Sequence, residues 1–269
     1  MSRAVPSPTC IVALGALAGL LSVAGGCATT APAPPPERAA PRPLASAEAA
    51  PWVDKSIDLA LAGDVEGAYE AARQAVRRDP RGLAVQVAWV EAQLAMGRRA
   101  EALQTARTAV EDHPDAPEAF YALGRADLAL VRRSDALDAF ETALHLRPDD
   151  LPSLVGLLAV HLQQGEGEDE VEELAELLRE RAPGDPYVLH NLAVAAEVRG
   201  DTPSAIALYE QAIAAAPTHP VAHYNLALLL EQEQGFEAAR ADYEAFVREA
   251  EPGAQRLVTA VRTRLEQKP

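Results

Sequence analysis

Small apolar residues recur along this chain at positions set by a series of evenly spaced prolines. Alanine stands twelve residues before most of these prolines and again five residues before them, while alanine or an aromatic residue stands eight residues before. The prolines are Pro80, Pro114, Pro148, Pro183 and Pro217, spaced by 34, 34, 35 and 34 residues, and Pro252 follows 35 residues later. A self-similar pattern with a period near 34 residues predicts a solenoid of stacked repeats.

Glycine and proline mark where the elements of each unit begin and end. Seventeen residues before the anchor prolines stand Gly63, Gly97 and Gly200, whereas the third unit has Val131 there. A glycine suits a turn between two helices, and the anchor proline ends the second helix because proline cannot continue it. A second set of prolines opens the first helix of the later units, where a missing N–H costs nothing. These are Pro117, Pro152, Pro186 and Pro220.

These spacings resemble the tetratricopeptide repeat, a pair of antiparallel helices in which small residues allow close approach and an aromatic residue fills the gap. The resemblance implies an all-α fold, a right-handed α-solenoid of about six helix pairs over 52–251, closed by a capping helix at 252–269. The repeats are expected at 52–82, 83–116, 117–150, 151–185, 186–219 and 220–251. Repeat four is degenerate, with Val171 and Leu178 at alanine positions. Repeat one has Lys55 and Ser56 where core is expected, which allows a first helix shifted by one residue.

Composition narrows the class of protein. Only 4% of the 269 residues are aromatic, and alanine, the best helix former, is abundant, which favours packed helices over a sheet. The net charge of −16 argues against a nucleic-acid-binding protein, which needs a basic surface. Both cysteines, Cys10 and Cys27, lie near the N-terminus, so the repeats are expected to hold no disulfide or cysteine metal site. The sequence has no visible catalytic motif, so the chain is predicted to be non-enzymatic, without cofactor or metal.

The first segment, residues 1–26, is predicted to be a secretory signal peptide. Arg3 precedes an apolar run over 11–24 that is too short for a transmembrane helix and ends in small residues. The end of the run resembles the lipobox of bacterial lipoproteins. That resemblance implies lipidation of Cys27 and, with alanine next to it, an outer-membrane location facing the periplasm of a Gram-negative bacterium. Cleavage after Ala28 and an uncleaved anchor are the alternatives. Residues 27–51 contain seven prolines and are expected to form an extended linker.

The resemblance to tetratricopeptide repeats also implies a concave groove, lined by the first helices, in which a partner binds. Tyrosine, histidine and charged side chains at the lining positions suit an extended peptide or an amphipathic helix. The predicted partner-binding residues are Tyr121, Arg125, Tyr187, His190, Glu197, Tyr224 and Glu231. The alternative is that some of these are half-buried packing residues. A clamp for a terminal carboxylate, known in one subfamily, is not expected, because Arg125 is the one basic residue placed in the groove.

Two further clusters have a structural explanation beside a functional one. The acidic run at 166–173 is expected to be a solvated helix start, with a docking patch for a basic partner as the alternative. His219 and His223 have the spacing of two metal ligands on a helix. Pro220, however, places His219 before the helix begins, and no third ligand is near in sequence, so no metal site is predicted.

Six repeats behind a lipid anchor resemble the secretin pilotins of type IV pili and other helical-repeat lipoproteins of envelope assembly, hydrolase regulation and motility. The resemblance implies a lipid-anchored periplasmic scaffold whose partners are proteins, possible partners including an outer-membrane secretin. The alternative is a soluble periplasmic adaptor that presents substrates to a protease or a cell-wall hydrolase.

Overall fold

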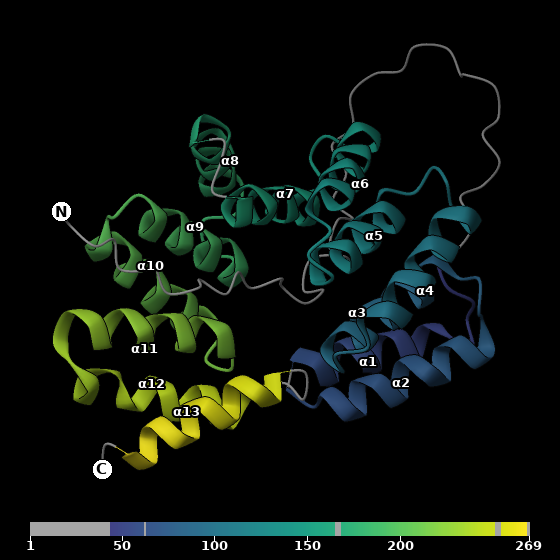
Figure 1. Ribbon diagram of the computed structural model, residues 1–269. Coiled ribbons are helices and arrows are strands. Elements are labelled where there is room, and N and C mark those ends of the chain that lie inside the picture. The colour runs from purple at the N-terminus through teal and green to yellow at the C-terminus, as the bar shows by residue number, and fades with distance from the viewer. Residues whose placement is uncertain (1–43, 62, 165–167, 251–253, 268–269) are drawn as a thin grey trace.

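The computed structural model describes residues 44–61, 63–164, 168–250 and 254–267, and over these ranges the chain forms thirteen α-helices and no strand (Figure 1). The helices are α1 (Ala50–Leu61), α2 (Val65–Arg78), α3 (Leu83–Ala95), α4 (Arg99–Asp112), α5 (Pro117–Ala129), α6 (Arg133–Leu146), α7 (Leu151–Gln164), α8 (Glu168–Arg181), α9 (Pro186–Val198), α10 (Thr202–Ala215), α11 (Pro220–Gln234), α12 (Phe236–Glu249) and α13 (Gln255–Gln267). The predicted all-α fold is confirmed.

The first twelve helices form six consecutive pairs, and each pair packs against the next one along the chain. Figure 1 shows that the stack follows a curved path, so that α12 and α13 come back toward α1 and α2. The two ends of the chain's helical part therefore face each other across the inside of the curve.

The two helices of a repeat approach closely because small residues lie between them. Ala68, Ala102, Ala136 and Ala205, which stand twelve residues before the anchor prolines, are at most 3% exposed. Ala207 on the same helix as Ala205 is exposed. The helical register that the proline spacing predicts is therefore correct in repeat five.

The turn between the two helices of a repeat requires a left-handed backbone. Gly63, Gly97 and Gly200 have φ angles of 78°, 73° and 77°, which residues with a Cβ rarely adopt. Val131 takes the glycine position in repeat three and keeps the same conformation, with φ 62° and a side chain that is 58% exposed. Such strain costs about 1–3 kcal/mol. The packing of the helices, and not the local sequence, fixes this turn.

Repeat one keeps the register of the other repeats. Ser56 is 4% exposed and its hydroxyl donates to the carbonyl of Ala68 at 2.9 Å, whereas Lys55 is exposed. The serine thus takes a small-residue position that Ala193 takes in repeat five, and the one-residue shift is not observed.

The start of the described chain packs on the first two repeats. The carbonyl of Leu44 accepts from the Ala84 N–H at 2.8 Å, and the Ser46 N–H donates to the Asp79 carboxylate at 2.7 Å. Residues 44–49 therefore belong to the folded stack, although the sequence analysis assigns them to the linker. The predicted signal peptide, Cys27 and the rest of the linker lie outside the described residues. Within the described ranges, no helix has the length and apolar character needed to cross a bilayer.

Repeat four accommodates larger residues at its alanine positions. Val171 and Leu178 are 9% and 0% exposed and lie in one apolar cluster with Ala175. The predicted acidic run begins outside the described residues, at Glu166, and continues along the start of α8, where Glu172 forms an ion pair with Arg199.

The last helix, α13, covers the apolar face of repeat six. Val258 and Val261 are 4% and 3% exposed and pack in one cluster with Phe246 of α12. A terminal helix of this kind protects a solenoid from exposing its last apolar face, as the sequence analysis expects.

Candidate functional site

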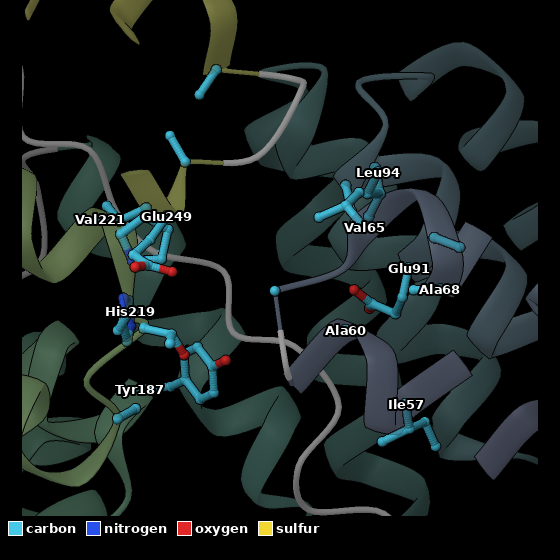
Figure 2. Close-up of a pocket in the computed structure, with 18 of the residues that line it drawn as sticks. Ile57, Ala60, Val65, Ala68, Glu91, Leu94, Tyr187, His219, Val221 and Glu249 are labelled. Atoms are coloured by element: carbon cyan, nitrogen blue, oxygen red, sulfur yellow. The ribbon is translucent and has the colours of Figure 1, made fainter. Parts of the chain in front are cut away.

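A pocket of about 540 Å³ lies between the two ends of the curved stack (Figure 2). We call it the end-to-end pocket. One wall comes from repeats one to three and the other from repeats five and six. The first wall includes Ile57, Val65, Glu91, Leu94, Arg99 and Arg125, and the second includes Tyr187, His219, Val221, Phe246 and Glu249. A volume of this size is typical of pockets that hold a ligand or a short peptide segment.

The N-terminal wall joins repeats two and three through a buried ion pair. Arg125 of α5 donates to the carboxylate of Glu91 of α3 at 2.6 Å, and the two side chains are only 7% and 12% exposed. Breaking such a pair by removing one partner leaves an uncompensated buried charge, which is strongly destabilising. The aliphatic side chains of Ile57, Val65 and Leu94 make the rest of this wall largely apolar.

The C-terminal wall is built around the start of α11. His219 is the N-cap of this helix, and its Nδ1 accepts from the backbone N–H of Ala222 at 3.2 Å. Its ring lies 5.0 Å from the ring of Tyr187 and stacks on His190 at 5.1 Å. Figure 2 shows Tyr187 and His219 together on this side of the pocket. The helix start and α9 thus place two aromatic side chains on one wall.

His219 is neutral at physiological pH. Burial lowers the pKa of its imidazole to about 4, and the neighbouring His223 charge lowers it further. Because Nδ1 accepts a hydrogen bond, the single ring proton belongs on Nε2. Nε2 is buried and has no hydrogen-bond partner in the described part of the chain.

The structure brings two of the seven predicted partner-binding residues into the end-to-end pocket, Arg125 and Tyr187. His190 needs correction: it is 0% exposed, and its ring packs between those of Tyr209 and His219, so its side chain offers no surface to a partner. Tyr121, 6% exposed, is likewise a core residue, with its ring 6.1 Å from that of Phe140 in repeat three.

The other three predicted residues are half-buried and make contacts within their own repeats. Glu197 accepts from the Tyr209 hydroxyl at 3.1 Å, and Glu231 accepts from the Tyr243 hydroxyl at 2.8 Å. Tyr224 packs on Phe246, with ring centroids 5.0 Å apart. Partner contact by these three residues stays a prediction.

Sequence reasoning missed most of the pocket because its two walls are more than 90 residues apart in the chain. One signal was available for Glu91, which stands 34 residues before Arg125 and carries the opposite charge. His219 was considered only as a metal ligand, and the described residues contain no group of three side chains suited to hold a metal ion.

Comparison with known proteins identifies the repeat. A family model described as the tetratricopeptide repeat matches residues 59–126, and a second model with the same description matches 121–186 and 190–254. No curated protein matches the chain.

Solved structures share the fold at low sequence identity. TTC0263, a thermophilic tetratricopeptide repeat protein of Thermus thermophilus, is 21% identical over 68% of this chain and 98% of its own, with a TM-score of 0.60. A tetratricopeptide repeat protein of Parabacteroides merdae is 20% identical over 82% and 87%, with a TM-score of 0.52. Human IFIT1, solved as a dimer with m7Gppp-AAAA, is 16% identical over 74% and 50%, with a TM-score of 0.61.

Proposed function

Because the chain belongs to the tetratricopeptide repeat family, we propose that it is a non-enzymatic scaffold that binds a protein partner in the end-to-end pocket. The observation that carries this proposal is the pocket itself, whose walls come from both ends of the stack and combine aliphatic side chains with Tyr187 and His219. Aromatic side chains set among apolar ones are the usual anchors of a protein interface.

A protein partner suits this chain better than RNA, although one structural neighbour was solved with a capped oligonucleotide. The net charge is −16, and phosphate recognition depends on clustered basic residues. The one arginine buried in the pocket, Arg125, is already engaged by Glu91.

The partner is sought at the cell envelope. The apolar run over 11–24 and the small residues before Cys27 support export and lipidation, and we propose an outer-membrane lipoprotein facing the periplasm. The favoured process is assembly of an envelope complex such as a pilus secretin. The second candidate is a soluble periplasmic adaptor for a protease or a cell-wall hydrolase.

Site-specific photo-crosslinking tests the binding proposal. A benzophenone amino acid placed at Leu94 or Val221 lies on one or the other wall of the pocket. The same label at Glu210, an exposed residue of α10, serves as the control. In the native host the two wall positions should give a discrete protein adduct and Glu210 should not. Adducts from Glu210 alone would place the partner on another surface.

Membrane fractionation tests the anchor separately. Cys27→Ala should move the protein from the membrane to the soluble periplasmic fraction, because the polar linker provides no other means of attachment. Membrane partition that is unchanged in the variant would contradict lipidation and favour an uncleaved anchor.

A further inference from the structure

The C-terminal wall of the end-to-end pocket contains a buried hydrogen-bond donor that has no acceptor. His219 is 5% exposed, its ring proton is on Nε2, and Nε2 has no partner in the described structure. An unpaired buried donor costs about 1–3 kcal/mol. Native proteins keep few such groups, and each one calls for an explanation. Because the ring lines the pocket, an occupant of the pocket can supply the missing acceptor.

The N-terminal wall contains a second donor without an acceptor. Arg99 is the first residue of α4, and its exposed guanidinium makes no ion pair or hydrogen bond to any described residue. The N-cap of this helix, Arg98, provides no side-chain cap, so the positive end of the helix dipole adds to the same potential.

The acidic groups of the pocket, in contrast, already have donors. Glu91 accepts from Arg125 at 2.6 Å, and Glu249 accepts from Arg248 at 2.7 Å. The chain as a whole carries a charge of −16, so an unpaired arginine in the pocket is a local exception to its electrostatics. What the pocket can still satisfy is an acceptor, and at Arg99 an anionic one.

Building on the proposed scaffold function, we infer that the occupant is an apolar peptide segment that carries an acidic side chain. The carboxylate pairs with Arg99, a backbone carbonyl accepts from Nε2–H of His219, and aliphatic side chains lie against Leu94 and Val221. A charged hydrogen bond of the first kind is stronger than a neutral one, and the apolar contacts supply the remaining affinity. A basic segment finds no free carboxylate on these walls.

Binding of defined peptides tests this inference. The probes are decapeptides of alanine, leucine and valine, acetylated and amidated at their ends, with aspartate, asparagine or lysine at one central position. Capped ends remove the terminal charges, so any preference reports the side chain. The full chain should bind the aspartate peptide about tenfold more tightly than the asparagine peptide and the lysine peptide least, by fluorescence anisotropy at low ionic strength.

Two variants assign the preference to residues. Arg99→Gln should reduce the preference for aspartate over asparagine to under about twofold. His219→Asn keeps an N-cap side chain but removes the donor from the pocket, and it should weaken all peptides about fivefold without loss of helical structure. Arg179→Gln on α8 makes the same charge change away from the pocket and should leave binding unchanged.

Three results would overturn the inference: equal binding of the three peptides, tighter binding of the lysine peptide, or unchanged affinities in both pocket variants. Failure of every peptide to bind would overturn it too. The scaffold proposal would survive any of these results if Leu94 and Val221 still crosslink a protein, so the two failures are distinguishable.

Discussion

Repeats three and five place an aromatic residue at the same position and satisfy it in different ways. Phe140 and Tyr209 stand eight residues before their anchor prolines, and both are 0% exposed. Phe140 lies directly over two glycines, because a Cβ added to Gly124 or Gly156 would come within 2.7 or 2.5 Å of its ring. The ring in repeat three is thus held by close approach of the backbones of α5 and α7.

Tyr209 is held by polar contacts instead. Its hydroxyl donates to Glu197 at 3.1 Å and its ring lies 5.5 Å from that of His190. In repeat three the position of Glu197 is taken by Leu128, which is 2% exposed. The same slot can therefore be filled by an apolar ring against glycine or by a phenol that reaches a carboxylate. The polar version adjoins the pocket wall through His190 and His219, so functional chemistry lies where the core itself is polar.

The largest effect is expected from emptying the apolar slot. Phe140→Ala should lower the free energy of unfolding by about 4 kcal/mol, because α5 and α7 cannot fully close the cavity. Chemical denaturation measures this. Leu146→Ala on the same helix, where the side chain is 39% exposed, is the control and should cost far less. A loss under about 1 kcal/mol for Phe140→Ala would mean that the repeats repack around the gap.

Acid should affect the polar region selectively through His219. Its folded-state pKa of about 4 lies below the unfolded value of about 6.5, so its contribution to stability is complete above pH 6.5 and is lost as the pH falls through 4. The total is about 3 kcal/mol. Charged or titratable neighbours are His223, whose charge opposes protonation, and Tyr187 and His190, whose rings contact it.

The variant His219→Asn tests this pH dependence because asparagine retains an N-cap but does not titrate. Its free energy of unfolding should fall less than that of the wild type between pH 7.5 and pH 4.5, as measured by urea titration at each pH. Parallel loss in both proteins would assign the acid sensitivity to other groups.

Adding one methyl group to the apolar slot should be intermediate in effect. Gly156→Ala puts a Cβ against the Phe140 ring and should cost about 2 kcal/mol by overpacking. Gly184→Ala is the matched control, since an added Cβ there meets nothing within 4 Å. If the two variants have equal melting temperatures, close backbone approach is not what holds Phe140.

The smallest effect is expected from removing the hydroxyl of the polar slot. Tyr209→Phe should cost about 1 kcal/mol, because the lost hydrogen bond is replaced in part by solvent at the half-buried Glu197. A double-mutant cycle with Glu197→Gln measures the coupling between the two side chains. Coupling near zero would reduce the contact to simple proximity.

Most of the fold was predictable because it depends on a repeated spacing. Alanines such as Ala205 and the glycine turns follow directly from the period, and even Val131 takes up the conformation of the glycine whose position it occupies. The strain at Val131 shows that many helix–helix contacts together outweigh one unfavourable residue.

The candidate site was much less predictable, because a period describes neighbours and the pocket joins the two ends of the stack. Placing Tyr187 opposite Leu94 depends on the accumulated curvature of several repeats, which no single motif encodes. The burial of His190 was missed for a related reason. Its surroundings, Tyr209 and His219, include the next repeat and depend on the packing between repeats.

The meeting of the two ends also bears on how such a chain loses its structure. In a linear array each repeat is stabilised only by its neighbours, so the terminal repeats are the first to fray. An occupant of the end-to-end pocket would touch repeats that are far apart in the array, and thereby link the opening of one terminus to the opening of the other. Occupancy would turn a chain of independent local equilibria into a closed circuit, whose two ends can be released only together.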